Sequence, residues 1–267
     1  MGLFQALILG IVQGATEFLP ISSSGHLVLV PAALEWASPS LIYDTTVHLA
    51  TLFAVVAVFW RDLIGLICSW WRGLCRGQPL NTVESRLAWW VILGTIPGIL
   101  AGLFLEETIE SFFESPRTVG VFLLITAVII ILAEVFGRRR RALTEIEWLD
   151  SLLIGIGQAT AIAPGISRSG VTISVGMFRG FTREAAARFS FILSVPIIAG
   201  AWLVQLIKLV RQGELLAEAP LLVIGFVTAL VCGYVAIRIL LAYLRKRSLY
   251  PFAVYCVIVG SLAIIFL

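Results

Sequence analysis

The sequence predicts an all-α polytopic membrane protein: an inverted-topology repeat of six spanning helices and two re-entrant helical hairpins that meet near the bilayer midplane. The first observation is composition, because the 267 residues are 60% hydrophobic and only 13% charged. Soluble domains average about 25% charged residues, so the composition excludes a water-soluble globular domain. The other two observations are the breaks in two apolar segments and the similarity of these breaks to each other.

Six apolar stretches are long enough to cross a bilayer as helices, each of which needs about 20 residues. Helices are expected because an isolated strand leaves backbone hydrogen-bonding groups unpaired in lipid. The predicted spans are residues 45–60 (extending towards Trp71), 86–105, 117–136, 186–208, 219–241 and 249–267.

Two further apolar segments, residues 2–36 and 149–179, are interrupted near the middle by Pro and Gly. The interruptions read "TEFLPISSSGH" and "AIAPGISRSGV", and each flanking half is short for a full span. A broken apolar segment at membrane depth is tolerated only where protein or a water-filled cavity surrounds it. Both segments are therefore predicted to be re-entrant helical hairpins.

The two interruptions match each other when the sequence is shifted by 145 positions without a gap. The match predicts a single membrane domain, 1–267, built from repeat 1–137 and repeat 148–267, each a hairpin followed by three spans. Three is an odd number, so the second repeat starts on the opposite side of the membrane and the hairpin tips meet near the midplane. The matched residues are Gly10, Ile11, Gln13, Ile21, Ser22, Ser24 and Gly25 with Gly155, Ile156, Gln158, Ile166, Ser167, Ser169 and Gly170.

The charged loops give the expected orientation. Basic loops are placed in the cytoplasm by the positive-inside rule, whereas the loop "EETIESFFESPR" between the second and third spans is acidic. The first hairpin is then expected to open outward and the second inward. The basic residues are Arg61, Arg72, Arg76 and Arg86, the run "GRRRRAL" at 137–143, Arg179 and Arg183, and Arg245, Lys246 and Arg247.

The first hairpin carries an ionisable group at membrane depth. Glu17 lies four residues after Gln13, so both side chains share one helix face. An intramembrane carboxylate is expensive and usually faces a cavity or a partner. Glu17 is therefore a candidate general base, metal ligand or partner of a cation; the alternative is a buried neutral acid satisfied by nearby hydroxyls.

The turn after Glu17 is rich in hydrogen-bond donors. A hydroxyl beside Glu17 and His26 is a candidate nucleophile, because a neighbouring base must take its proton. Serine in such a turn also caps the following helix, whose free N–H groups favour an anion. The residues concerned are Ser22, Ser23, Ser24, Gly25 and His26.

Arg168 occupies the tip of the second hairpin, flanked by Ser167, Ser169 and Thr172. A guanidinium is a planar, permanently charged, bidentate clamp for phosphate. The alternative role is an ion pair with Glu17, and the two roles are compatible. The two tips together predict an oxyanion site for an amphiphile with a phosphate head.

The remaining histidine is His48, in "DTTVHLATLF", and it is interpreted as a packing residue or a support for the site. Asp44 and Asp150 are expected at helix starts, where the helix dipole stabilises carboxylates.

The segments "VQGATEFLPISSSGH" and "PGISRSGVT" resemble the two signature motifs of bacterial undecaprenyl-diphosphate phosphatases of the bacitracin-resistance type. The resemblance covers essentially the whole chain, including "FWRDL" and "FSFILSVP". It implies an enzyme of the cytoplasmic (inner) membrane that hydrolyses undecaprenyl diphosphate to undecaprenyl phosphate and inorganic phosphate. This reaction recycles the lipid carrier for cell-wall synthesis and gives bacitracin resistance. The resemblance also implies a divalent cation, Mg²⁺ or Ca²⁺, and an active site open to the outer (periplasmic) side.

Carried over position by position, the resemblance assigns roles to individual residues. The catalytic residues are Glu17, Ser23, His26 and Arg168; the substrate-binding residues are Gln13, Ser22, Ser24, Gly25, Ser167, Ser169, Gly170 and Thr172; and the metal ligand is Glu17. The family motif has Glu or Gln at the first position, and Gln13 is uncharged here, so it cannot serve as a charged ligand or base.

Two versions of the chemistry stay open at this point. Either Ser23 attacks the terminal phosphorus while Glu17 or His26 takes its proton, or Glu17 activates water directly. The implied partners are the lipid diphosphate and membrane lipids, with no nucleic acid. Small residues in the spans are compatible with a homodimer.

A lipid or anion transporter (flippase) is the alternative function, because inverted repeats with broken midplane helices are also a transporter architecture. Turnover separates the two hypotheses, since a transporter moves its ligand unchanged.

Overall fold

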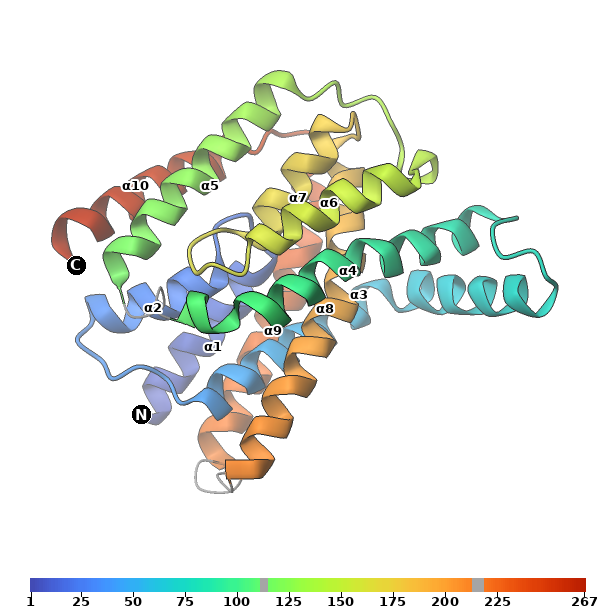
Figure 1. Cartoon of the computed structure of the whole chain (residues 1–267). Helices are drawn as coiled ribbons and strands as arrows, with labels where there is room; N and C mark the ends of the chain where they lie inside the picture. Colours follow the sequence, from blue (N-terminus) through green and yellow to red (C-terminus); the bar gives the residue numbers. More distant parts are fainter. Residues whose placement is uncertain (111–114, 213–218) are drawn as a thin grey trace.

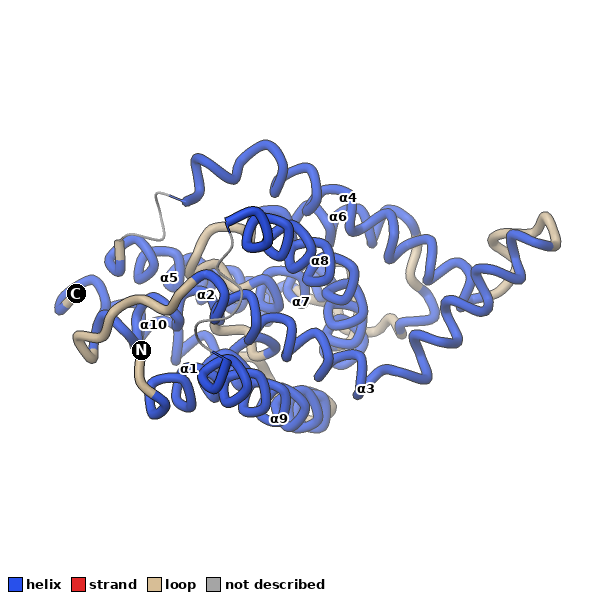
Figure 2. The backbone as a smooth tube through the Cα atoms, turned by 90° about the horizontal axis from the view of Figure 1, so that it is seen from below, coloured by secondary structure: helices blue, strands red, loops and turns tan. Residues whose placement is uncertain are grey.

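The structure is a computed structural model that describes residues 1–110, 115–212 and 219–267, and these ranges are almost entirely helical (Figures 1 and 2). Within them the only β pairing is an isolated bridge between Arg141 and Phe181. The helices are α1 (Leu3–Phe18), α2 (Ser23–Ala33), α3 (Leu41–Cys75), α4 (Val83–Glu110), α5 (Pro116–Phe136), the 3-10 turn η2 (Leu143–Glu145), α6 (Trp148–Thr160), α7 (Arg168–Phe178), α8 (Arg183–Gln212), α9 (Ala219–Leu244) and α10 (Tyr250–Phe266).

The helical, polytopic class predicted from composition is confirmed. Among the described residues, five helices are long and apolar enough to cross a membrane: α3, α4, α5, α8 and α9. The sixth predicted span, 249–267, corresponds to α10, which is a shorter apolar helix of 17 residues. Large apolar side chains cover the outside, and Phe104 and Phe266 are 79% and 74% exposed. Such a surface belongs in lipid rather than in water.

The helix at the first predicted span, 45–60 extending towards Trp71, is longer than predicted. Helix α3 runs through 35 residues, and its backbone leaves helical geometry at Phe59. Beyond this bend, α3 and the start of α4 extend away from the rest of the molecule, to the right in Figure 1. The predicted acidic loop at 106–117 includes residues 111–114, which lie outside the described residues.

Both predicted interruptions are breaks between two short helices. Residues 19–22 separate α1 from α2, and residues 161–167 separate α6 from α7. Each break contains a proline, Pro20 or Pro164, which cannot donate the backbone bond that would continue a helix. A serine begins the helix after each break. The Oγ atoms of Ser22 and Ser167 cap the N-termini of α2 and α7, which have 11 residues each.

Each hairpin packs against a long helix from the other half of the chain. Helix α1 packs on α9, and α6 packs on α4. Glycine allows the close approach in both cases. A Cβ atom at Gly10 would lie 2.8 Å from the carbonyl oxygen of Gly225, and one at Gly155 would lie 2.9 Å from the Cα atom of Gly94. The two hairpins are thus held in the middle of the molecule, while α5 and α10 lie side by side at its edge (Figure 1).

Two buried carboxylates anchor the basic segment after α5. Glu134 accepts hydrogen bonds from Arg139 (2.7 Å), from Arg183 and from the backbone N–H of Leu249 (2.7 Å). These contacts join α5 to α8 and to the start of α10. Part of the basic segment 137–143 therefore contributes to packing as well as to the charge distribution.

The second carboxylate is Asp150, in the first turn of α6 as expected. It pairs with Arg141 at 2.7 Å and with Arg179 at 2.6 Å. The hydrogen bonds to Asp150 raise the pKa of the Arg141 guanidinium above its usual value. The two ends of the second hairpin are therefore joined, because Asp150 lies in the first turn of α6 and Arg179 directly follows α7.

We expect Gly155→Ala to lower the free energy of unfolding by about 1–3 kcal/mol, because the new methyl group would overpack the contact between α6 and α4. Thermal unfolding of the purified protein in detergent measures the change. Gly200→Ala in α8 is the matched control, since nothing lies within 4 Å of the position that its new methyl group would take. The control is expected to be neutral or stabilising by about 0.5–1 kcal/mol, and equal losses in both variants would contradict the packing argument.

Candidate active site

The tips of the two hairpins are hydrogen-bonded to each other at the centre of the molecule. The Gly165 N–H donates to Ser22 Oγ at 3.1 Å, and Ser169 Oγ donates to the Leu19 carbonyl at 3.0 Å. Ser22 has φ +69° and Gly165 has φ +98°. Both backbones are thus in the left-handed region, which is strained for serine. The cross-hairpin contacts stabilise this turn.

Two helix N-termini face this junction. Ser22 Oγ accepts from the Gly25 N–H at 3.3 Å, and Ser167 Oγ accepts from the Gly170 N–H at 3.0 Å. A Cβ atom at Gly25 would lie 3.1 Å from the Gly165 Cα atom, so glycine permits the close approach of the tips. The first turns of α2 and α7 both carry free backbone donors and a partial positive charge, which together favour an anion.

Glu17 is the centre of the side-chain network. Its Oε1 atom accepts from Arg168 Nη2 at 2.7 Å. Its Oε2 atom accepts from Gln13 Nε2 at 2.9 Å and from Ser23 Oγ at 2.5 Å. The ion pair considered from the sequence is therefore present, and the shared helix face of Gln13 and Glu17 is confirmed. The carboxylate is 8% exposed and Arg168 is 14% exposed, so neither charge is left in bulk water.

Arg168 retains one unused donor. Its Nη2 atom is bonded to Glu17, but Nη1 is buried and has no hydrogen-bond partner among the described residues. A buried unsatisfied N–H group is costly by about 1–3 kcal/mol and is rare in folded proteins. The Oε1 atom of Gln13 is buried and unpartnered in the same way. An oxyanion bound at the tips would satisfy Nη1.

Of the two candidate proton acceptors for Ser23, Glu17 and His26, only Glu17 is hydrogen-bonded to it. Ser23 Oγ donates to Glu17, whereas the His26 ring is engaged elsewhere. His26 Nδ1 lies 2.7 Å from the Ser22 carbonyl oxygen, and its Nε2 lies 2.7 Å from the Tyr255 hydroxyl on α10. The two rings are stacked, with centroids 5.6 Å apart. Of the two proton acceptors considered from the sequence, the geometry thus brings Glu17 to Ser23.

The histidine that faces Glu17 is His48 on α3, which sequence reasoning kept outside the catalytic group. Its Nε2 atom lies 3.9 Å from Glu17 Oε2, and its Nδ1 atom lies 2.8 Å from the Asp44 carbonyl oxygen. The spacing of Asp44 and His48, one helical turn apart, was the signal that the sequence offered. The sequence could not show which face of α3 lies against Glu17, because that depends on how α1 and α3 pack together.

The second tip is supported by two hydroxyl groups that the sequence did not identify, those of Thr126 and Ser190. Thr126 Oγ1 on α5 accepts from the Ser167 N–H at 3.0 Å and donates to the Gly165 carbonyl at 3.1 Å. The hydroxyls of Thr172 and Ser190 lie 2.6 Å apart. Ser167 and Ser169 have their Oγ atoms 3.2 Å apart, as Ser22 and Ser24 do at 3.4 Å in the first tip.

The oxygen donors at the junction suit a cation that is shared with a phosphate group. Among the described residues there is no cluster of three or more His, Cys, Asp or Glu side chains that could hold a metal. The junction nevertheless has the Glu17 carboxylate and the unpartnered Gln13 Oε1 atom. Mg²⁺ is usually held by one or two carboxylates, water and substrate phosphate oxygens, and this limited donor set fits that mode.

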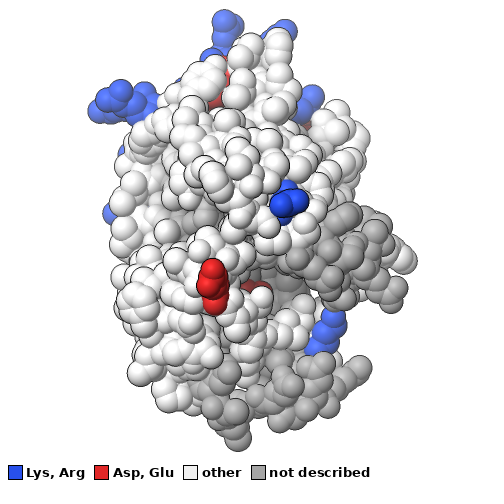
Figure 3. Space-filling model, turned by 90° about the vertical axis from the view of Figure 1, so that its left-hand side faces the viewer, with Lys and Arg blue, Asp and Glu red and all other residues white. Residues whose placement is uncertain are grey.

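The arrangement is suited to phosphoryl transfer. A hydroxyl is hydrogen-bonded to a carboxylate that can take its proton, which is the geometry of an activated nucleophile. A guanidinium and two helix N-termini supply positive charge beside it, as transfer of a phosphoryl group requires. The face at the left of Figure 1 is hollowed, and an acidic side chain lies within the hollow (Figure 3).

Comparisons with known proteins agree with this chemistry. Residues 6–262 match the family described as bacitracin resistance protein BacA. The chain is 46% identical over 267 residues to an undecaprenyl-diphosphatase of Thermomicrobium roseum, a match covering 97% of this chain and 96% of that protein. It is 44% identical over 264 residues to an undecaprenyl-diphosphatase of Moorella thermoacetica, covering 99% and 97%. A third relative of the same name, from Geotalea daltonii, is 42% identical over 270 residues, covering 100% and 99%.

We expect a double-mutant cycle of Glu17→Gln and Arg168→Gln to show a coupling energy of about 1–3 kcal/mol in unfolding experiments. Each single variant leaves one buried charge without its partner, which is strongly destabilising. The double variant removes both charges, so its loss of stability is expected to be smaller than the sum of the two single losses.

The matched control is the more exposed pair of Asp62 and Arg188, whose atoms lie 2.9 Å apart with side chains 45% and 33% exposed. A cycle of Asp62→Asn and Arg188→Gln is expected to give less than about 1 kcal/mol, since solvent screens such pairs. Additive losses in the Glu17 and Arg168 cycle would contradict a coupled buried pair.

Proposed function

Because the chain belongs to the bacitracin resistance protein BacA family, we infer that it is an undecaprenyl-diphosphatase, which hydrolyses undecaprenyl diphosphate to undecaprenyl phosphate and inorganic phosphate. The product is the lipid carrier used for cell-wall synthesis, and the recycling reaction gives resistance to bacitracin. The observation that carries the inference is the junction of the hairpins, where Ser23 bonds Glu17 and Arg168 has a buried unpartnered donor.

Substrate binding begins with the diphosphate at the two tips. Arg168 Nη1 donates to a phosphate oxygen, while Nη2 stays on Glu17 and holds the guanidinium plane in place. The first backbone N–H groups of α2 and α7 add further donors. Hydroxyls of Ser22, Ser24 and Ser169 line the same turns. These groups are directed at the site before the substrate arrives, so little reorganisation accompanies binding.

In the first chemical step, Ser23 Oγ attacks the terminal phosphorus and its proton passes to Glu17 Oε2, which lies 2.5 Å away. The bond from the terminal phosphorus to the bridging oxygen breaks, and undecaprenyl phosphate leaves with the electron pair. Arg168 stabilises the charge on the transferring group. Water then attacks the phosphorus of the phosphoserine, and the bond from phosphorus to Ser23 Oγ breaks. Glu17 returns its proton to Ser23 Oγ, which restores the serine hydroxyl and releases inorganic phosphate.

The supporting residues have positioning roles. Gln13 donates to the same Glu17 oxygen that accepts from Ser23 and so orients the carboxylate. His26 connects the first turn of α2 to Tyr255 on α10. Thr172 donates to the Arg168 carbonyl at 2.7 Å and supports the start of α7.

A divalent cation, Mg²⁺ or Ca²⁺, belongs to the proposal as well. Glu17 and the Oε1 atom of Gln13 would hold it together with oxygens of the diphosphate. When bound, the cation supplies positive charge that offsets the charge of the diphosphate.

The proposed architecture is a pair of inverted repeats with six spans, α10 being the sixth. Helices α1 and α6 begin 145 residues apart, at 3 and 148, and so do α2 and α7, at 23 and 168. The packing between the repeats is also symmetric. The first helix of each repeat, α1 or α6, packs on the corresponding long helix of the other repeat, α9 or α4. We place the protein in the cytoplasmic membrane with the site open to the outer side. Basic side chains gather at one end of the molecule, at the top of Figure 3, which supports a cytoplasmic assignment for that end.

We expect the purified protein in detergent to release phosphate from undecaprenyl diphosphate, to lose this activity with EDTA and to regain it with Mg²⁺ or Ca²⁺. Colorimetric measurement of phosphate release is sufficient. Activity that persists in EDTA would contradict the cation. No release with any divalent cation, from protein shown to be folded, would contradict the phosphatase and direct attention to lipid movement across a bilayer.

We expect Ser23→Ala to lower kcat by at least about a thousandfold, because the nucleophile is removed. Glu17→Gln is expected to lower kcat by about 10²- to 10⁴-fold through loss of the base. Substrate labelled in the terminal phosphate should label Ser23 in an acid-quenched sample. Thr46→Ala is the control, since its hydroxyl donates only to its own helix at Ile42. Full activity in Ser23→Ala would instead favour attack by water that Glu17 activates.

A further inference from the structure

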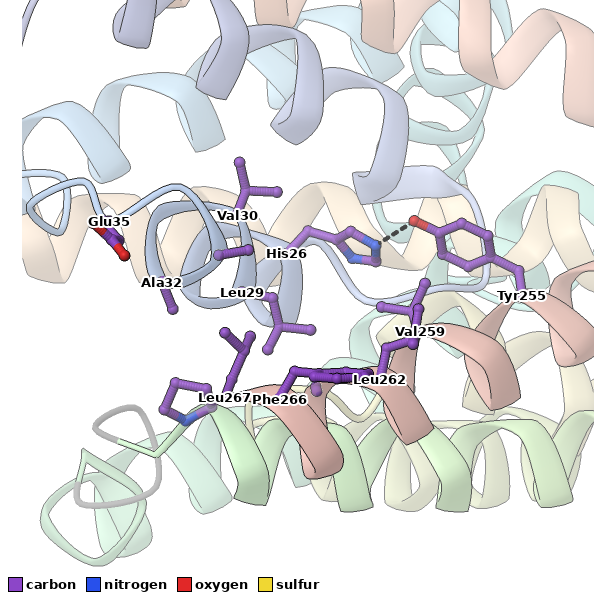
Figure 4. A pocket seen from close by; sticks show the side chains of 13 residues that line it. His26, Leu29, Val30, Ala32, Glu35, Tyr255, Val259, Leu262, Phe266 and Leu267 are labelled. Atoms are coloured by element: carbon purple, nitrogen blue, oxygen red, sulfur yellow. Dashed lines mark hydrogen bonds between the residues drawn. The ribbon is translucent and has the colours of Figure 1, made fainter.

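An elongated cavity of about 730 Å³ lies between α2 and α10, close to the start of α5 (Figure 4). Its walls are mostly aliphatic and aromatic. The apolar residues that define its two long sides are Leu29 and Val30 on α2, and Val259, Leu262 and Phe266 on α10. The lining has three polar side chains, His26, Glu35 and Tyr255.

The polar lining residues lie at opposite ends of the cavity. His26 and Tyr255 are hydrogen-bonded to each other at one end, whereas Glu35 follows the last turn of α2 at the other end (Figure 4). Both ring nitrogens of His26 are hydrogen-bonded within the protein. This end of the cavity is therefore lined by the rings of His26 and Tyr255 rather than by free polar atoms. The cavity therefore suits an elongated apolar ligand.

The cavity begins next to the junction of the hairpins. His26 lies three residues after Ser23 on α2, and its Nδ1 atom contacts the Ser22 carbonyl oxygen. One helical turn, about 5 Å, therefore separates the backbone of the nucleophile from the first lining residue. From His26 to Ala33 the cavity follows α2 for about 10 Å, away from the diphosphate site.

We propose that this cavity is the subsite for the prenyl chain, and that it holds the isoprene units next to the diphosphate of the lipid substrate. The proposal rests on the proposed function and deepens it. A diphosphate bound at the tips places the first isoprene units within about one helical turn of His26. The chain then needs an apolar path into lipid, and the space between α2 and α10 supplies one.

The size and chemistry of the cavity support this occupant. Pockets of about 300–1,000 Å³ bury most of a small ligand, so 730 Å³ holds a segment of a long chain while the remainder stays in the bilayer. A second described pocket is smaller, about 210 Å³, and its lining includes charged residues, among them Arg61, Asp62 and Arg188. It does not suit an apolar chain.

The test fills the cavity without changing the diphosphate site. Val259→Trp places an indole in the cavity, and Val257→Trp is the matched control, because Val257 is 41% exposed on the same helix and is not part of the lining. Each variant is assayed with undecaprenyl diphosphate and with methyl diphosphate, which has the same head and no isoprene unit. Leu262→Trp repeats the test at a second lining position if Val259→Trp does not fold.

We expect Val259→Trp to raise KM for undecaprenyl diphosphate about tenfold, which is about 1.4 kcal/mol of binding free energy. The kcat of Val259→Trp and its kcat/KM for methyl diphosphate should stay within about twofold of the starting protein. Both kinetic parameters of Val257→Trp should also stay within about twofold. An unchanged KM for the long substrate, or an equal loss with both substrates, would overturn the proposal.

A second measurement is independent of turnover. Undecaprenyl phosphate with a diazirine in its first isoprene unit is photolysed in the presence of the protein, and mass spectrometry maps the adducts. We expect the adducts to concentrate on 26–33 and 255–267, and to be lost from them in Val259→Trp. Adducts spread over all lipid-facing helices would show ordinary lipid contact and overturn the subsite. Absence of phosphate release from every diphosphate would overturn the proposed function, and the adduct map would still decide the subsite.

Discussion

The ion pair of Glu17 and Arg168 is the interaction on which the rest of the structure depends. Both side chains are largely buried, in a chain that is 60% hydrophobic and suited to a lipid environment. An unpaired charge in such surroundings is very unfavourable, whereas a paired and hydrogen-bonded one is tolerated. The pair joins residues 151 positions apart, so it forms only when both hairpins are in place. The proposed chemistry therefore uses the same two side chains that join the hairpins.

The two hairpin tips approach each other closely because the breaks contain glycine, which has no side chain, and serine, which supplies hydrogen bonds across the junction. Gly165, at φ +98°, lets the second tip pass beneath α5, since a Cβ atom there would lie 2.5 Å from the Val119 carbonyl oxygen. Ser22 then satisfies the Gly165 N–H across the junction. Backbone groups that helix breaks expose at membrane depth must find partners within the protein. The same polar tips that meet this requirement form the anion site that we propose.

The surroundings of the site match the two-part nature of an amphiphile. Backbone donors, hydroxyls and Arg168 converge at the tips, while the space between α2 and α10 is lined by apolar side chains. Helix α2 takes part in both regions, because its first turn carries Ser23 and its later turns line the cavity. His26 and Tyr255 lie between the two regions, with an aromatic stack on the apolar side and hydrogen bonds on the polar side.

Much of the architecture could be predicted from the sequence because the signals are local. Long apolar runs become helices in lipid whatever they pack against, and Pro20 and Pro164 end helices through their own covalent structure. The i,i+4 spacing of Gln13 and Glu17 determines a contact within one helix, and the structure shows it at 2.9 Å. Serine caps at the two tips follow from the same kind of local rule.

Tertiary structure alone decided which groups meet across helices. His26 is nine residues from Glu17 in the sequence, yet its ring bonds Tyr255 on α10, and the more distant His48 lies beside Glu17 instead. Thr126 supports the second tip from α5, and no sequence pattern indicated it. Such contacts depend on the rotation and depth of each helix against its neighbours, which close packing at positions such as Gly10 and Gly155 determines. The sequence by itself determined the helices, their breaks and the chemical types at the tips; packing determined which of those types face one another.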